Sequence, residues 1–259
     1  MDNRIAIILT SIERPQALKK SVESILANWQ DNWVLLVGLQ DEMGSESDKI
    51  LDKIICNNPN KHIKQYYLEY DCGISVARNE LILHSFLLGC DYILLTADSI
   101  LFNNSMNDLN FIIQQMEKQK YSRCGFNLLE RIPWEANLKL IPNKAFELDF
   151  IDSKDKEKQL LVPCDIVRNF HISTTESMKV GYDESLIMCE HEDEAYRYKE
   201  AEYKVCCTNF INGLYEKPQN TPKYDEIRSK NFRIGQQRLK DKYSLTSWVT
   251  YKNLDRIKQ

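Results

Sequence analysis

Residues 4–10 read RIAIILT, a continuous apolar run between polar residues that is typical of a strand buried on both faces of a sheet. Pro15 then begins a segment whose apolar side chains recur at helical spacing as far as Trp29. The alternation continues, with strands predicted over 33–39, 63–68 and 92–95 and helices over 45–56 and 74–88. Three strand–helix units in a row predict a parallel sheet with right-handed crossovers.

The second half of the chain has a less regular pattern. It predicts helices over 106–119, 190–202 and 227–243, strands over 121–129, 146–151, 160–173 and 203–208, and a charged loop over 154–158. The sequence therefore favours an α/β fold of the Rossmann-like kind, in which helices flank a mostly parallel central sheet. A length of 259 residues fits one such domain over 1–215, followed by a helical, basic C-terminal extension over 216–259.

The charge of the chain is unevenly distributed. The formal net charge is −4, which gives no general preference for nucleic acid or membranes. From Lys217 onward, however, eleven Lys and Arg residues are balanced by only four Asp and Glu residues and are interleaved with aromatic side chains. Three interpretations of this basic extension stay open: contact with an anionic membrane surface, contact with nucleic acid, or a helix that packs back on the domain with its charged face in solvent.

The cysteines and the N-terminus bear on the cellular compartment. None of the eight cysteines forms a CxxC pair, and most lie in apolar runs where a free cysteine acts as a small hydrophobic residue. This pattern predicts a reducing compartment. The N-terminal apolar run is too short for a signal peptide, and no window approaches the roughly 18 apolar residues of a membrane span. We expect a cytoplasmic protein, with peripheral attachment to the inner face of the membrane as the alternative.

Ligands of parallel α/β sheets bind at the carboxyl ends of the strands, so the residues after each predicted strand are candidates for function. After the first predicted strand come four polar residues, Thr10, Ser11, Glu13 and Arg14. Their side chains can bind a base, a ribose or a phosphate, and a helix cap is the alternative role. Asp41, after the second strand, can accept hydrogen bonds from uracil or ribose. Neither a GxGxxG nor a Walker A pattern occurs, which argues against hydride transfer and P-loop chemistry.

The segment 73–80, GISVARNE, follows the third predicted strand. Gly73 allows a close backbone approach at the start of the helix, and Arg78 and Asn79 lie one to two turns further on. This segment is similar to the G-x-S-x-A-R-N block of family-2-like GT-A glycosyltransferases, which lines their nucleotide-sugar pocket. Four other segments resemble further blocks of that family in the same order, 8–26, 89–95, 180–183 and 190–197. The resemblance covers residues 4 to 208.

The resemblance implies a GT-A fold and a nucleotide-sugar donor, with UDP-sugars favoured. The donor-binding residues that it implies are Thr10, Ser11, Glu13, Arg14, Asp41, Gly73, Arg78, Asn79 and Asp98. It also implies transfer of a hexosyl or N-acetylhexosaminyl group, with inversion, to a hydroxyl group of a cell-surface glycan or a lipid-linked acceptor in polysaccharide biosynthesis. A non-catalytic GT-A binding module and a glycosyltransferase that acts on modified DNA bases are the alternatives.

Two positions depart from the family pattern. Where the family has its metal-binding D-x-D, residues 96–99 read TADS, so Asp98 is the one carboxylate available to Mn²⁺ or Mg²⁺. With a single carboxylate, Arg or Lys side chains can bind the phosphates instead. In the closing block His191 takes the place of the catalytic aspartate, and histidine can act as a base near neutral pH. Glu190 and Asp193 are the other candidates, and a solvated acidic helix start is the structural alternative.

Two residues are candidates for contact with the acceptor. His171 lies just before the closing block and can contact an acceptor or a cation. Trp134 lies in a predicted loop and can stack on the face of a sugar. An ordinary packing role is the alternative for both residues.

Overall fold

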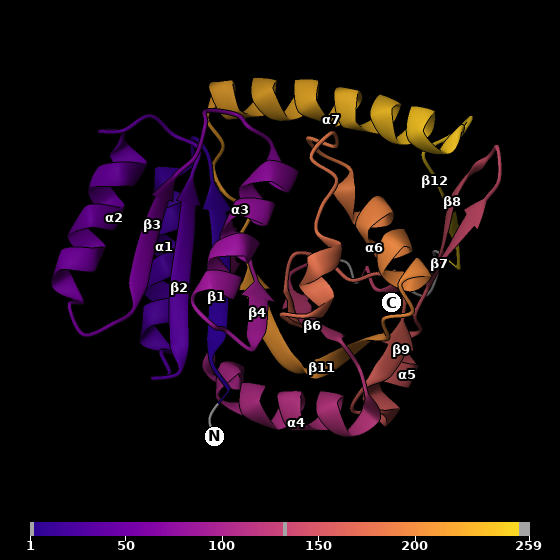
Figure 1. Ribbon diagram of the computed structural model, residues 1–259, viewed down its shortest axis with the longest axis horizontal. Coiled ribbons are helices and arrows are strands. Elements are labelled where there is room, and N and C mark those ends of the chain that lie inside the picture. The colour runs from indigo at the N-terminus through magenta and orange to yellow at the C-terminus, as the bar shows by residue number, and fades with distance from the viewer. Residues whose placement is uncertain (1–2, 132–133, 254–259) are drawn as a thin grey trace.

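Figure 1 shows the computed structural model, which describes residues 3–131 and 134–253. Its main sheet begins with the four predicted strands, β1 (Ile5–Ser11), β2 (Trp33–Leu39), β3 (Ile63–Tyr67) and β4 (Tyr92–Leu95). β1 pairs in parallel with β2 and β4, and β2 pairs in parallel with β3. The connecting helices are α1 (Pro15–Ala27), α2 (Glu46–Asn57) and α3 (Ile74–Leu87). The predicted parallel units are therefore confirmed.

The second half of the chain extends this sheet with mixed pairing. The added strands are β5 (Ile100–Leu101), β6 (Arg123–Leu129), β9 (Val162–Cys164), β10 (His171–Thr174) and β11 (Val205–Tyr215). β10 lies antiparallel between β4 and β6, whereas β11 runs parallel to β6. The order is β3-β2-β1-β4-β10-β6-β11-β5, and β9 pairs with β11. The run of parallel strands from β3 to β4 thus ends where β10 lies antiparallel beside β4.

Helices cover both faces of the main sheet. Side chains that alternate along β1 point to opposite faces, as the two-residue period of a strand requires. Ile5, Ile7 and Leu9 pack in one core with α1, α2, η1 (Asn104–Asp108) and α4 (Leu109–Gln119), and Ala6 and Ile8 pack in another with α3. These two faces bury residues 5–9 of β1 and fix its carboxyl end at one edge of the sheet.

A second sheet and two helices complete the fold. The second sheet joins β7 (Ala136–Ile141), β8 (Ala145–Phe150) and β12 (Val249–Lys252) in the order β12-β8-β7. The remaining helices are α5 (Ser153–Lys158), η2 (Ser177–Val180), α6 (Glu190–Glu200) and α7 (Pro222–Tyr243). In Figure 1, α7 runs across the top of the view from above β1 and α3 to the second sheet. Among the described residues, no helix combines the length and apolar character needed to cross a membrane.

Two predicted elements of the second half differ from the structure, and two strands of the second sheet were not predicted. The run 160–173 is two strands with a loop between them, in which the Asp165 carboxylate accepts from the Leu138 amide and pairs with Lys199. The charged loop 154–158 is helix α5, capped by the Asp152 side chain. β7 and β12 were not predicted; in the structure they pair with the two edges of β8.

The basic helix α7 packs back on the domain. Its buried residues Tyr224, Asn231, Gly235 and Leu239 face the body of the molecule. A Cβ atom at Gly235 would lie 2.2 Å from the carbonyl oxygen of Met188, so the helix approaches the loop before α6 more closely than any larger residue permits. Lys230 and Arg233 are exposed on the other side. For residues 222–243 the structure thus shows the packed arrangement among the three that the sequence leaves open.

Candidate active site

Two adjoining cavities lie at the carboxyl ends of β1, β2 and β4. The inner cavity, about 320 Å³, is lined by the ends of these strands, including Thr10, Ser11, Thr96 and Asp98. The outer cavity, about 270 Å³, is lined by the start of α6, by α7 and by aromatic side chains, including Trp134, Phe232 and Trp248. Gln40, Arg78, Arg131, Asn169, Tyr224 and Arg228 line both cavities. The two therefore form one cleft, at the sheet edge where the sequence predicts ligands.

Asp98 is held at the floor of the inner cavity by two donors. The Ser11 hydroxyl donates to its Oδ2 at 2.9 Å, and Arg14 Nη1 donates to its Oδ1 at 2.8 Å. Burial raises the pKa of Asp98, and the Arg14 charge opposes this shift. Arg14 also donates to the Tyr224 hydroxyl at 3.2 Å and lies over the Tyr224 ring. One guanidinium thus connects the ends of β1 and β4 to helix α7.

Asp41 and Glu13 shape the loop after β1 and do not line either cavity of the cleft. The Glu13 amide donates to Asp41 Oδ1 at 2.5 Å, which holds Glu13 in the left-handed backbone region at φ 55°. The Glu13 carboxylate accepts from Tyr70 and Lys223. The residue after β2 that reaches the cleft is Gln40, next to the predicted Asp41.

Gly73 and Asn79 position the loop before α6. Gly73 has φ 89°, and a Cβ atom there would lie 2.8 Å from Ile187 Cγ2, so only glycine fits without displacing that side chain. Asn79 bonds to the backbone N–H and C=O of Tyr182 and lies outside both cavities. These residues thus hold in place the loop before α6, which forms part of the wall of the cleft.

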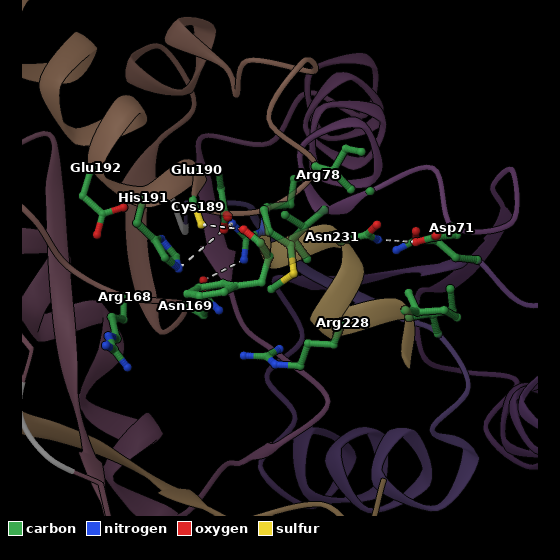
Figure 2. Close-up of a pocket in the computed structure, with 18 of the residues that line it drawn as sticks. Asp71, Arg78, Arg168, Asn169, Cys189, Glu190, His191, Glu192, Arg228 and Asn231 are labelled. Carbon is green, nitrogen blue, oxygen red and sulfur yellow. Dashed lines mark hydrogen bonds and ion pairs between the residues drawn. The ribbon is translucent and has the colours of Figure 1, made fainter. Parts of the chain in front are cut away.

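Arg78 is buried at the junction of the two cavities. Its Nη1 donates to Glu190 Oε1 at 2.6 Å, and its Nη2 donates to Asn169 Oδ1 at 2.6 Å. Glu190 Oε1 also lies 3.5 Å from His191 Nε2. Figure 2 shows the His191 ring pointing toward this group, from the start of α6. The guanidinium of Arg78 is therefore occupied by protein partners.

The three residues at the start of α6 have displaced pKa values. Burial lowers the pKa of His191 to about 4 although Glu190 is close, so its imidazole is neutral at pH 7. Burial acts to raise the pKa of Glu190, but His191 and Arg78 hold it below its ordinary value. Burial, assisted by the charge of Glu190, raises the pKa of Glu192 to about 7. The His191 side chain is 24% exposed and the Glu190 side chain 6%, so the imidazole is the more accessible group.

Asp193 lies outside the cleft lining and is fully enclosed. Its carboxylate accepts from Arg197 Nε at 2.9 Å, Lys242 Nζ at 2.5 Å and the Tyr243 hydroxyl at 2.8 Å. These three donors come from α6 and α7, so Asp193 ties the two helices together.

Trp134 and His171 have different positions. Trp134 lines the outer cavity, and the Arg168 guanidinium carbon lies 3.7 Å from its ring centroid. His171 is buried in β10 beyond the lining of both cavities, with its Nδ1 2.6 Å from the Arg168 carbonyl oxygen. Burial lowers the pKa of His171 well below its ordinary value. His171 therefore supports the loop that carries Arg168.

Five arginines line the cleft, and they fall into two groups. Arg14 and Arg78 pair with carboxylates. Within the described part of the chain, Arg131, Arg168 and Arg228 form no ion pair, and Arg168 Nε has no hydrogen-bond partner. Sequence patterns did not single out these three residues, since they come from separate segments that carry no common motif. Three unpaired guanidinium groups make the cleft a site for anions.

The side chains around Asp98 do not fit a divalent cation. Both carboxylate oxygens already accept from Ser11 and Arg14, and the guanidinium lies where a metal would have to approach. Among residues 3–131 and 134–253, no group of three His, Cys, Asp or Glu side chains is arranged to hold a metal ion. Mn²⁺ and Mg²⁺ require several oxygen ligands at once. The positive charge that the structure places beside Asp98 is the Arg14 guanidinium.

No protein-family model matches the sequence, and no curated protein sequence matches it. Solved structures do match the fold. The mannosyltransferase PcManGT from Pyrobaculum calidifontis, in complex with GDP-Man and Mn²⁺, has a TM-score of 0.63 at 8% identity, covering 92% of this chain and 64% of that one. GalNAc-T7 with UDP, GalNAc and Mn²⁺ has a TM-score of 0.67 at 9% identity, covering 84% and 44%. TarS 1-349 of S. aureus, in complex with UDP-GlcNAc, has a TM-score of 0.60 at 10% identity, covering 93% and 73%. The chain thus spans less than two thirds of the first of these proteins, and the likeness concerns the fold.

Proposed function

From the GT-A fold that this chain shares with these transferases, we propose that it is a glycosyltransferase that moves a sugar from a nucleotide-sugar donor to a hydroxyl group of an acceptor. The observation that carries the proposal is the two-part cleft at the carboxyl ends of β1, β2 and β4. Its polar inner cavity suits a nucleotide, its aromatic outer cavity suits a sugar, and a neutral histidine stands beside the junction of the two.

The inner cavity is the proposed donor site. Ser11, Thr10 and the buried Thr96 hydroxyl face it, and among the described residues Thr96 Oγ1 has no hydrogen-bond partner. A buried hydroxyl of this kind is satisfied when a ligand group bonds to it. UDP-sugars are the favoured donors, since one solved structure with this fold holds UDP and another holds UDP-GlcNAc. Arg228 lines the junction and offsets the charge of the diphosphate.

His191 is the proposed general base, and Glu190 the group that orients it. A neutral imidazole has a free ring nitrogen that can take the proton of the acceptor hydroxyl, and Glu190 stabilises the imidazolium that forms. The acceptor oxygen forms a bond to the anomeric carbon while the bond from that carbon to the diphosphate oxygen breaks. The electron pair leaves with the diphosphate, whose growing charge the arginines offset. A single displacement of this kind inverts the anomeric centre.

The finer parts of the proposal follow the sequence resemblance. The transferred group is a hexosyl or N-acetylhexosaminyl group, and the acceptor is a glycan. The pattern of free cysteines supports the cytoplasm as the place where the enzyme works. Residues 1–215 carry the donor fold, and the extension 216–259 completes the cleft through Tyr224, Arg228 and Phe232. The proposed site has no step through a metal, because the residues around Asp98 do not fit one.

Calorimetric titration with UDP-, GDP- and CMP-sugars tests the donor site. We expect saturable binding of one nucleotide class and loss of at least about tenfold in affinity for Asp98→Asn, which leaves Arg14 without its partner. Asp52→Asn, an exposed position on α2, is the matched control and should bind normally. A wild-type protein that binds none of the sugar nucleotides overturns the proposal. Binding without release of nucleoside diphosphate, with a panel of glycans as acceptors, would favour a non-catalytic module.

A further inference from the structure

The unpaired arginines of the cleft lie at the junction of the two cavities, as Arg131 and Arg228 do, and in the outer cavity, as Arg168 does. The positive charge of Arg228 lowers the pKa of Asp98 in the inner cavity, and it also lowers the pKa of Arg131. The positive charge of Arg131 lowers the pKa of Arg168, and the negative charge of Glu192 raises it. Figure 2 shows Arg228 extending from α7 into the space that has Arg168 on its far side. The positive charge therefore continues beyond the donor end of the cleft.

Arg168 belongs to the outer cavity alone. Arg131 and Arg228 line both cavities, whereas Arg168 lines only the one that contains His191 and Glu192. A donor diphosphate in the inner cavity lies beside Asp98, where Arg14 and Arg228 are at hand. Arg168 thus remains available for a second anion, on the side where the acceptor hydroxyl must approach His191.

Arg168 stays charged in its surroundings, and its guanidinium forms no ion pair with the described residues. Burial lowers the pKa of Arg168 to about 10, and the neighbouring Arg131 acts in the same direction, so the side chain is still charged at pH 7. Its guanidinium is stacked on Trp134, which fixes the plane of the fork. A rigid, unpaired fork beside a second unpaired arginine is suited to bidentate binding of a phosphate or a carboxylate.

Aromatic side chains form part of the wall of the outer cavity. Phe232 on α7 packs edge-to-face on Trp248, with ring centroids 5.3 Å apart. Together with Trp134 these rings line the cavity next to the arginines. Aromatic faces bind the apolar face of a sugar ring, and the arginines bind a charged substituent on it.

We propose that the acceptor of this enzyme is an anionic sugar, which carries a phosphate or a carboxylate that Arg168 and Arg131 bind in the outer cavity. The proposal rests on the proposed function, since it describes the second substrate of the same cleft. It assigns Arg168 to acceptor selection rather than to the donor.

The test uses the full chain saturated with the nucleoside diphosphate that binds most tightly, so that the donor arginines are already occupied. Glucose, glucose 6-phosphate and glucuronate are then titrated as neutral, phosphate and carboxylate probes of one ring. We expect the better of the two anionic probes to bind at least about tenfold more tightly than glucose, as charge-assisted hydrogen bonds predict. The comparison of the two anions identifies which charged group the site takes.

Variants separate the acceptor role from the donor role. In Arg168→Gln the preference for the anionic probe should fall to about twofold or less, while the affinity for the nucleoside diphosphate changes by less than about twofold. Arg168→Lys, which keeps the charge and loses the fork, should retain part of the preference. Arg233→Gln, at an exposed position on α7, is the control and should behave as the wild type. Thermal melting of each variant checks that it is folded. If Arg168→Gln does not fold, the same titrations with Arg131→Gln test the anion site instead.

Three results would overturn the proposal. Equal binding of all three probes means that no anion site exists in the outer cavity. An Arg168→Gln variant that loses nucleoside diphosphate affinity in proportion to the probe places Arg168 in the donor site. A wild-type chain that binds no nucleotide overturns the proposed function itself, and the first titration reports this before any acceptor probe is added.

Discussion

Arg14 Nη1 lies 2.8 Å from Asp98 Oδ1, so a guanidinium occupies the side of the only carboxylate that the metal-binding motif retains. Asp98 is buried, and its other oxygen accepts from Ser11. A buried carboxylate with a fixed cationic partner gains little from exchanging that partner for a hydrated ion, because the ion must first lose its water. The pair therefore bears directly on whether donor binding depends on a metal.

Donor binding should be independent of divalent cations and dependent on Arg14. Addition of EDTA or Mn²⁺ should change the affinity for the sugar nucleotide by less than about twofold. Arg14→Gln should weaken nucleotide binding by about 10- to 100-fold, since it removes a charge from the site and leaves the buried Asp98 without its cationic partner. Arg233→Gln is the matched control. A requirement for Mn²⁺ in the wild type, seen in the same titration, would show that Asp98 exchanges Arg14 for a metal.

The assignment of His191 as base predicts a particular pH profile. His191→Ala should lower kcat by about 10²- to 10⁴-fold and leave the affinity for the donor unchanged. The pKa of His191 is lowered to about 4, so the imidazole is already neutral above pH 5 and kcat/KM should be level from there to pH 8. Glu190→Gln should lower kcat less, because it removes only the orienting carboxylate. A profile that rises through pH 7 would instead identify Glu192 as the base.

Gly235→Ala should destabilise the protein, although the same exchange inside a helix ordinarily stabilises by about 1 kcal/mol. The new Cβ atom would lie 2.2 Å from the Met188 carbonyl oxygen, so α7 has to move away from the loop before α6. We expect a loss of about 1–3 kcal/mol in the free energy of unfolding, together with weaker donor binding because Tyr224 and Arg228 move with the helix. Ser229→Ala, at an exposed position of the same helix, is the control. An unchanged or higher melting temperature for Gly235→Ala would mean that this contact is not tight.

The first half of the fold was predictable because each of its strands and helices is specified by the pattern of its own residues. Apolar runs such as 4–10 fix the strands, and chain order places Thr10, Ser11 and Asp98 at one edge of the sheet. The second half depends on pairing between distant segments. β10 is inserted antiparallel between β4 and β6, and Arg14 meets Tyr224 across 210 positions. No periodicity in the sequence encodes such contacts.

The site was predictable to the same extent. The residues at the start of α6 were identified as a group, but their separate positions depend on the turn of the helix. Asp193 and Arg197 are four residues apart, a spacing that predicts a pair on one helix face and thus a structural role for Asp193. Arg131, Arg168 and Arg228 come from three segments that only the tertiary fold brings together. Whether an arginine has an ion-pair partner depends on which residues the fold brings near it, so the sequence pattern does not predict it.

Glu192 should make the stability of the protein depend on pH in a direction opposite to that of an ordinary carboxylate in an ion pair. Burial, with Glu190 adding to it, raises its pKa from 4.5 to about 7, while Arg168 opposes the shift and Tyr251 on β12 also faces this group. Between these pH values the folded protein keeps a proton that the unfolded chain releases, so stability is full below pH 4.5 and falls as pH rises to 7.

The loss that Glu192 causes should amount to about 3 kcal/mol, at about 1.4 kcal/mol for each pH unit. Glu192→Gln cannot ionise, so the difference between its free energy of unfolding and that of the wild type should grow in favour of the variant from pH 4.5 to 7 and then stay constant. Urea denaturation at a series of pH values measures this difference and cancels the other groups that titrate in the same range. Glu200→Gln, at the exposed end of α6, should give a difference that does not depend on pH. If the Glu192→Gln difference is equally flat, the carboxyl group is hydrated in the folded protein, and the outer cavity is more open to water than its lining indicates.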